Sequence, residues 1–264
     1  MYATRTPSAE VREMVGKPRL SIVIATRNVT RTFERCMRSI LEQHFTSWEL
    51  LISDGGSTDD TIELIHKYEN HIAWWQSKAD NGIYDAWNQA LIHAKGDYVC
   101  FLGADDAWAD PDVLQELFSA IDSRTYDLVT SRGLIFSTDS GESSTFGSAW
   151  NYRRLGRRMV VCHPGLLHRR ELFDTYGLFD TRYRIAGDLE FLLRLPSSIT
   201  TKDVAKVTVH VEADGVSRKN FYARLREQRS ILSQCGRFGA IYAYAVWLDR
   251  LFRYPIARIL RIPY

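Results

Sequence analysis

The first half of the chain alternates short apolar runs with segments whose apolar residues recur every three or four positions. The runs predict buried strands, and the three- to four-residue spacing predicts amphipathic helices. Strands that alternate with helices of this length form a mainly parallel sheet with crossover helices. The predicted strands are 20–25, 48–53, 72–76 and 97–102, and the predicted helices are 30–43, 57–68 and 83–94.

The second half of the chain is less regular. Two apolar segments within 127–150 flank a polar stretch, which indicates a hairpin or flap. After an irregular stretch, residues 188–195 have helical spacing, 204–211 resemble a strand, and the chain from 221 onward is helical and basic. We expect an organisation into a polar leader, one domain with two halves and a C-terminal segment: 1–18, 19–225 (halves 19–115 and 116–225) and 226–264.

Composition narrows the class of protein. A charged fraction of 25% and a hydrophobic fraction of 45% are typical of a globular protein, and a net charge of +2 gives no reason to expect nucleic-acid binding. The four cysteines fit no zinc or redox spacing, and Cys100 lies in an apolar run, so we expect free thiols and a cytoplasmic setting. No apolar stretch precedes Leu20, so we expect no signal peptide, and no run reaches the roughly 18 apolar residues of a membrane span.

Two adjacent carboxylates, Asp105 and Asp106, follow the apolar run 98–102. Carboxylates are ligands for Mg²⁺ or Mn²⁺, and these ions usually also hold phosphate oxygens. In open α/β sheets, ligands bind beyond the carboxyl ends of the strands. The segment therefore indicates a metal–diphosphate site, although a helix start at Asp110-Pro111 is the alternative explanation for the acids.

The first strand-to-helix turn, 25–28, contains no glycine. A dinucleotide-binding unit needs a glycine-rich turn there, so that the pyrophosphate can approach the backbone, and no P-loop sequence occurs elsewhere. The phosphates of a bound nucleotide then need another partner, and a metal ion on Asp105 and Asp106 would serve.

Five segments match a known family in its order and spacing: 20–28, 51–59, 80–88, 96–98 and 103–106. With these segments the chain resembles family 2 glycosyltransferases. The resemblance implies a GT-A fold, which is a Rossmann-related, mainly parallel sheet flanked by helices, here followed by a helical basic tail. It also implies a nucleotide-sugar donor, a divalent metal ion and inversion at the anomeric carbon, most closely as in bacterial exopolysaccharide or O-antigen repeat-unit transferases.

The resemblance also assigns roles to residues. Asp105 is the first choice as metal ligand, and Asp106 is expected to bind metal, hold the ribose or order the loop. Gly103 stands where many relatives have an aspartate, which removes one acid. The nucleotide and donor sugar are expected to contact Thr26, Asn28, Asp54, Asp80, Gly82 and Asp85.

Inversion requires a base that takes the proton of the acceptor hydroxyl, and a carboxylate fits this task. By its match to the family's acidic motif, Asp188 is the predicted base and Glu190 the alternative. A helix cap is the structural alternative for Asp188. His163 is expected to contact the diphosphate or acceptor unless it is structural, and His210 is a weaker candidate for the metal site.

The C-terminal stretch 238–264 mixes aromatic, aliphatic and arginine side chains, with no acid after Asp249. This composition favours a helix on an anionic membrane, with packing on the protein as the alternative. The resemblance implies a saccharide or a polyprenyl-diphosphate-linked saccharide as acceptor, and a lipid-linked acceptor agrees with a location at the inner face of the cytoplasmic membrane. A non-catalytic nucleotide-sugar-binding scaffold and a sugar nucleotidyltransferase remain as alternative functions.

Overall fold

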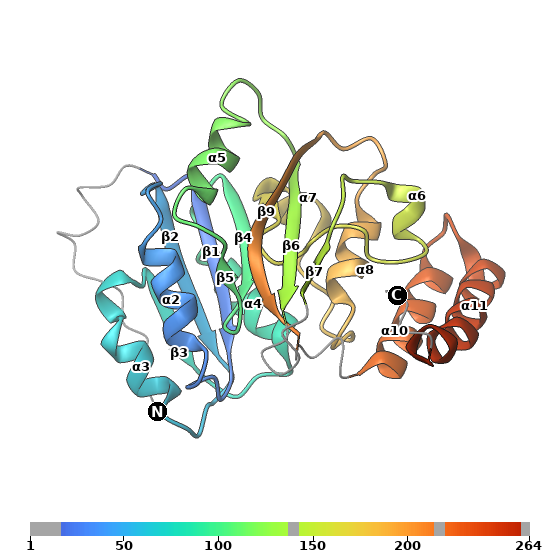
Figure 1. Ribbon diagram of the computed structural model, residues 1–264, viewed down its shortest axis with the longest axis horizontal. Helices are drawn as coiled ribbons and strands as arrows, with labels where there is room; N and C mark the ends of the chain where they lie inside the picture. Colours follow the sequence, from blue (N-terminus) through green and yellow to red (C-terminus); the bar gives the residue numbers. More distant parts are fainter. Residues whose placement is uncertain (1–16, 137–142, 214–219, 260–264) are drawn as a thin grey trace.

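The computed structural model describes residues 17–136, 143–213 and 220–259 (Figure 1). Within this part, nine strands form one sheet in the order β3-β2-β1-β4-β8-β6-β9-β5, and β7 pairs with β6. The strands are β1 (Leu20–Thr26), β2 (Trp48–Asp54), β3 (Trp74–Ser77), β4 (Tyr98–Gly103), β5 (Ala107–Trp108), β6 (Leu128–Phe136), β7 (Ser143–Phe146), β8 (Leu167–Arg169) and β9 (Thr201–Glu212).

Helices cover both faces of the sheet, and two more lie at one end (Figure 1). They are α2 (Phe33–Leu41), α3 (Thr61–Lys67), α4 (Ile83–Leu91), α5 (Val113–Ser119), α6 (Tyr152–Leu155), α7 (Glu171–Tyr176), α8 (Gly187–Arg194), α10 (Phe221–Gln234) and α11 (Gly239–Ile259), with a short 3₁₀ turn at Glu69–His71.

The alternation of side chains along β1 divides the core into two layers. Ile22 packs with Met37 of α2 on the face that α2, α3 and α5 cover. Val23 points to the other face and packs in the cluster that holds Trp87 of α4, together with residues of α7 and α8. Because both faces of the parallel strands are buried, the middle of β1, β2 and β4 is a continuous apolar run.

The carboxyl ends of six strands meet at one edge of the sheet. Strands β1 to β4 are parallel to one another. The short β8 runs antiparallel to both β4 and β6, so β6 has the direction of β4, and β9 is parallel to β6. The six strands β1, β2, β3, β4, β6 and β9 therefore end at the same edge, at the bottom of Figure 1.

The structure confirms the α/β fold and every strand and helix predicted for residues 20–102, with shifts of one to three residues at most ends. The hairpin in 127–150 is present as β6 and β7, and the strand and helix near 204–211 and 188–195 are β9 and α8. The sheet is mixed rather than mainly parallel beyond β4, because β8 and β5 pair antiparallel with their neighbours. Most of the polar leader, residues 1–16, lies outside the described residues.

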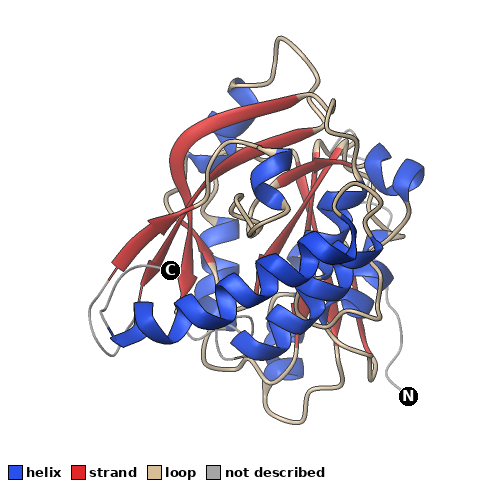
Figure 2. Ribbon diagram, turned by 90° about the vertical axis from the view of Figure 1, so that its right-hand side faces the viewer, coloured by secondary structure: helices blue, strands red, loops and turns tan. Residues whose placement is uncertain are grey.

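The irregular stretch after residue 150 contains three short elements that the pattern did not predict: α6, β8 and α7. They are three to six residues long, too short for a periodic signal. The basic C-terminal region forms two helices, α10 and α11, which lie side by side (Figure 2). No helix in the described part of the chain has the length and apolar character needed to cross a membrane.

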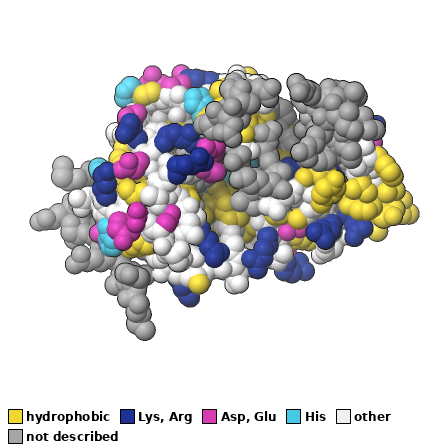
Figure 3. Space-filling view, turned by 60° about the horizontal axis from the view of Figure 1, so that its bottom comes forward, with side chains coloured by type: hydrophobic (Ala, Val, Ile, Leu, Met, Phe, Trp, Pro, Cys, Tyr) yellow, Lys and Arg dark blue, Asp and Glu magenta, His cyan; other side chains and the backbone are white. Residues whose placement is uncertain are grey.

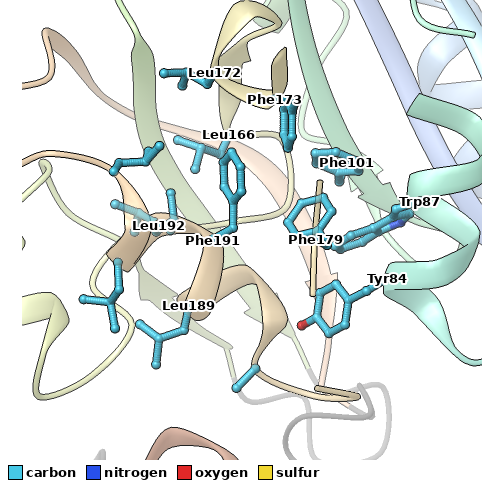
Figure 4. Packing of buried hydrophobic residues seen from close by; sticks show 14 of the residues in the cluster. Tyr84, Trp87, Phe101, Leu166, Leu172, Phe173, Phe179, Leu189, Phe191 and Leu192 are labelled. Atoms are coloured by element: carbon cyan, nitrogen blue, oxygen red, sulfur yellow. The ribbon is translucent and has the colours of Figure 1, made fainter. Parts of the chain in front are cut away.

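An aromatic cluster joins the sheet to the helices on the α4 face (Figure 4). At its centre Phe101 of β4, 1% exposed, lies 4.6 Å from the ring of Trp87 and 5.0 Å from the ring of Phe179. Phe173 and Phe191 stack at 4.5 Å beside it, so α7 and α8 pack on the same centre as α4. Trp87 is a core residue, and Cys100 is a buried free thiol, as expected.

We predict that Phe101→Ala lowers the free energy of unfolding by about 3–5 kcal/mol, because it removes a fully buried ring at the junction of four elements. Urea unfolding followed by tryptophan fluorescence measures this loss. The matched control is Ile92→Ala, a side chain 70% exposed at the end of α4, which should change stability by less than about 0.5 kcal/mol. Equal losses in the two variants would show that the cluster does not carry the stability assigned to it.

Candidate active site

Polar residues end the parallel strands at one level of the sheet. Thr26, Asp54 and Ser77 are register partners across β1, β2 and β3, and Gly103 of β4 lies beside Ala25. The segments that sequence analysis singled out after β1, β2, β3 and β4 therefore meet at one edge. This is where an open α/β sheet binds its ligand.

Asp54 is fully buried at this edge and is saturated with hydrogen bonds. Its carboxylate accepts from Thr26 Oγ1 at 2.9 Å, from Ser77 Oγ at 2.7 Å, and from the backbone N–H groups of Gly56 and Ser57 at 3.0 and 2.8 Å. The hydroxyl of Ser57 also donates to it. Asp54 thus connects the ends of three strands. The predicted contacts of Asp54 and Thr26 with the nucleotide stay predictions.

Asn28 connects the first of these loops to the second. Its Oδ1 accepts the N–H of Thr58 at 2.9 Å, and its own N–H donates to Ser57 Oγ at 2.8 Å. Asn28 has a φ of 54°, a left-handed conformation that asparagine tolerates better than most residues. Next to it, Asp59 receives hydrogen bonds from Thr30 and Thr61, which, against the effect of burial, lower its pKa to about 2.

The loop after β3 brings Asp80 against the Asp54 loop, and Gly82 and Asp85 follow at the start of α4. Asp80 accepts the N–H of Gly82 at 2.8 Å, and a Cβ atom on Gly55 would lie only 2.5 Å from Asp80 Oδ2, so this approach requires glycine. Asp85 accepts the N–H of Asn81 at 2.9 Å, which lowers its pKa. These hydrogen bonds fix the shape of the loop, and the predicted sugar contacts of the three residues stay predictions.

Gly103 makes room for both candidate metal ligands. A Cβ atom at this position would lie 2.6 Å from Asp105 Oδ1 and 2.6 Å from Asp106 Oδ2. Asp106 folds back to accept the N–H of Gly103 at 3.0 Å. Because position 103 has no side chain, the carboxylates of Asp105 and Asp106 can both lie over the end of β4.

The environment of this pair suits a cation. Asp106 is 4% exposed, and burial together with the charge of Asp105 raises its pKa to about 8. A buried carboxylate beside a second one is costly unless a positive charge compensates it. In the described part of the chain, no three His, Cys, Asp or Glu side chains converge on one point, so Asp105 and Asp106 offer two carboxylates and no third protein ligand of these types.

Sequence analysis missed a charged cluster beside these acids. Arg35 of α2 donates to the backbone carbonyl of Asp105, and its guanidinium lies 3.7 Å from Glu212. Arg31 also pairs with Glu212, at 3.2 Å. Glu212 ends β9 and comes to the site only through the β6–β9 pairing, which no local pattern reveals. Arg31 lies just before α2 and Arg35 in its first turn. Because they are four residues apart, both can face the same side.

Asp188 lies in the first turn of α8 and faces α4. Its Oδ1 accepts the hydroxyl of Tyr84 at 3.1 Å and the N–H of Leu189 at 2.8 Å. Burial raises the pKa of Asp188 to about 6, against the lowering effect of these hydrogen bonds and of Arg224. A Cβ atom on Gly187 would lie 2.8 Å from the Tyr84 ring, so glycine is needed for this approach. A carboxylate with this pKa is suited to accept a proton near neutral pH.

The other candidates have different surroundings. Glu190 is paired with Arg194 at 3.0 Å on its own helix. His163 is 5% exposed and stacks on Trp87 and Phe101 in the aromatic cluster, where burial lowers its pKa to about 3. This is the environment of a neutral packing residue, and the predicted contact of His163 with the diphosphate or acceptor stays a prediction.

His210 lies on β9 and pairs with Ala107, the residue that follows Asp106. The ring of His210 contacts the ring of Phe136. Its role at the metal site stays a prediction.

The family model for glycosyl transferase family 2 matches residues 21–174. The PGL/p-HBAD biosynthesis glycosyltransferase of Mycobacterium tuberculosis is 32% identical over 222 residues, which cover 80% of this chain and 85% of that protein. A putative glycosyltransferase, EpsE, of Bacillus subtilis is 28% identical over 69% of this chain and 68% of its own length.

Solved structures share the fold. S. aureus TarS 1-349, in complex with UDP-GlcNAc, superimposes with a TM-score of 0.67 at 17% identity and covers 88% of this chain and 71% of its own. The mannosyltransferase PcManGT of Pyrobaculum calidifontis, in complex with GDP-Man and Mn²⁺, gives 0.64 at 18% identity and covers 89% and 72%. The GT-A fold and the sequence match agree with the site geometry, and the chain belongs to glycosyl transferase family 2.

Proposed function

We propose that the chain is an inverting, metal-dependent glycosyltransferase. It moves a sugar from a nucleoside diphosphate sugar, UDP-linked, to a hydroxyl of a glycan or a polyprenyl-diphosphate-linked saccharide in bacterial surface polysaccharide synthesis. The observation that carries the proposal is the buried carboxylate of Asp188, held by Tyr84 in the first turn of α4, two residues after Gly82. A direct displacement needs a base beside the donor, and this hydrogen bond between α8 and the start of α4 supports that arrangement.

The donor side is formed by the loops at the carboxyl edge. The Asp54 and Asn28 networks hold the first two loops rigid, which pre-organises a surface for the base and ribose. The donor sugar would contact the next residues, Asp80, Gly82 and Asp85. The metal-bound diphosphate would lie at Asp105 and Asp106. The TarS and PcManGT structures, which contain UDP-GlcNAc and GDP-Man, support a nucleotide-sugar at this edge.

Asp105 and Asp106 would hold a divalent ion, Mg²⁺ or Mn²⁺, which offsets the negative charge of the departing diphosphate. The Mn²⁺ in the PcManGT complex supports this choice. Asp188 takes the proton of the acceptor hydroxyl as that oxygen attacks the anomeric carbon. The carbon–oxygen bond to the diphosphate breaks in the same step, so one displacement inverts the configuration and no sugar–enzyme bond forms.

A panel of nucleotide sugars with Mn²⁺ and a saccharide or lipid-linked acceptor tests the function. We expect one donor to be turned over with release of nucleoside diphosphate, and Asp188→Asn to lower the rate by about 10²–10⁴-fold, the usual contribution of a general base. Release of pyrophosphate would instead identify a nucleotidyltransferase. Binding of donors without turnover would identify a scaffold, and full activity of Asp188→Asn would refute the assigned base.

The metal site is tested by thermal unfolding. Mn²⁺ should raise the Tm of the wild type, because it binds the folded chain and relieves the repulsion between Asp105 and Asp106. Gly103→Ala should abolish this rise, since the added methyl group collides with both carboxylates. Gly236→Ala is the matched control, because no heavy atom lies within 4 Å of a Cβ atom there. An equal Mn²⁺ shift in both variants would contradict the site.

We further propose that α11 rests on an anionic membrane at the cytoplasmic side. Ile241, Tyr244 and Phe252 are 90%, 51% and 67% exposed on one face of this helix, while Ala243 on the opposite face is buried. Hydrophobic side chains gather over this end of the molecule, with lysine and arginine side chains beside them (Figure 3). The single acid of α11, Asp249, is paired with Arg253, so the face is apolar and basic, as membrane-surface helices are.

Vesicle flotation tests the membrane contact. The double variant Ile241→Ser/Phe252→Ser should bind vesicles with phosphatidylglycerol at least about tenfold more weakly than the wild type, because two apolar side chains no longer enter the bilayer. Ile92→Ser changes an equally exposed side chain outside α11 and should have no effect. Unchanged binding of the double variant, or equal binding of the wild type to uncharged vesicles, would contradict the proposal.

A further inference from the structure

Glu227 of α10 is bonded to the segment that precedes the predicted base. Its Oε1 accepts the backbone N–H of Arg184, and its Oε2 accepts the N–H groups of Ile185 and Ala186, all three at 2.9 Å. Three consecutive amides of the chain thus point at one carboxylate that comes from more than forty residues further on.

This arrangement is specific for an anion. Consecutive amide N–H groups that face the same way form a concave site of positive partial charge. The site lies at the start of α8, whose helix dipole adds to the attraction. A carboxylate has two acceptor oxygens for the three donors, whereas a glutamine would direct its own N–H₂ group at one of them.

The helix that carries Glu227 is firmly held. Residues of α10 before and after Glu227 are buried: Leu225, Ile231 and Leu232. The neighbouring Gln228, 4% exposed, donates to the carbonyl of Arg157 at 2.7 Å and accepts from Arg250 of α11 at 2.8 Å. The carboxylate of Glu227 therefore occupies a fixed position relative to the core, and the 184–186 segment takes its position from it.

The proposed reaction centre begins directly after this segment. Gly187 packs against the Tyr84 ring, and Asp188 accepts the Tyr84 hydroxyl, so the base is held by α4 on one side and by the Glu227 hydrogen bonds on the other. The side chain of Arg184 extends over Gly82. A Cβ atom added to Gly82 would lie 3.5 Å from Arg184 Nη1. A shift of the segment would move the base and this guanidinium together.

We propose that Glu227 is a positioning residue for catalysis, which holds Asp188 and Arg184 in register with the donor loop. The inference rests on the proposed function, because it assigns Asp188 as the base. It makes α10 part of the catalytic unit, although this helix lies beyond the residues 21–174 that the family model matches.

Amide hydrogen exchange tests the hydrogen bonds without any assumption about activity. Glu227→Gln has the same shape as the wild type and should lose protection in a peptide that contains 184–186, while peptides of β1 and β4 keep theirs. Ser233→Ala, an exposed position on the same helix, is the matched control and should exchange like the wild type. Unchanged protection of 184–186 in Glu227→Gln would overturn the proposal at its first step.

Kinetics then separate positioning from simple stabilisation. We expect kcat of Glu227→Gln to fall about tenfold or more with a smaller change in the donor KM, since a misplaced base affects the chemical step. Glu227→Asp, which keeps the charge but is one methylene shorter, should recover part of this loss. A kcat equal to the wild type in a variant whose 184–186 amides have lost protection would show that Glu227 only stabilises the fold.

The pH dependence provides a further readout. The groups that face Asp188 are Tyr84 from α4 and Arg224 from α10, and burial is the main cause of its raised pKa of about 6. A looser 184–186 segment admits water, so the acidic limb of the kcat profile in Glu227→Gln should move to lower pH. In Tyr84→Phe, which removes a hydrogen bond to the carboxylate, the limb should move to higher pH. An unshifted limb in Glu227→Gln would contradict positioning, and absence of any turnover by the wild type would refute the proposed function instead.

Discussion

The buried carboxylate of Asp54 is the interaction on which the donor side of the molecule depends. Three strand ends can meet at one edge only if the polar groups that arrive there are satisfied, because an unpaired buried charge costs several kcal/mol. The hydroxyls of Thr26 and Ser77 and the amides of the following turn all donate to this one group. The same carboxylate that shapes the turn therefore fixes the distances between the first three loops, before any ligand arrives.

The acids at the end of β4 have the opposite surroundings. Asp54 is surrounded by donors, whereas Asp106 has a neighbouring acid and a pKa raised to about 8. Arg31 and Arg35 lie nearby but are shared with Glu212. One carboxylate is thus stabilised by hydrogen bonds within the protein and serves as structure, and the other is left short of positive charge, as the proposed metal site requires. This contrast distinguishes the two kinds of aspartate where sequence position alone does not.

Local pattern predicted the donor half well, since strands buried on both faces form continuous apolar runs and their ends carry the polar residues. Asp188 became the predicted base through the family resemblance and not through local pattern. Neither could predict that Glu212 or Glu227 reach these segments, since each arrives through pairing between parts far apart in the chain. The stacking of the His163 ring could not be predicted either, because the aromatic cluster forms around it only in the folded chain.

The hydrogen bonds between α10 and the 184–186 segment also have a consequence for recombination within the family. A chimera that exchanges everything after residue 174 transfers the proposed base together with the helix bonded to the segment before it. A crossover between 188 and 227 separates the two, and a foreign helix then has to offer an anion at the same place. Exchange of acceptor specificity between relatives, by evolution or by design, is therefore expected to proceed through the first kind of junction, with the C-terminal helices inherited as one block with Asp188.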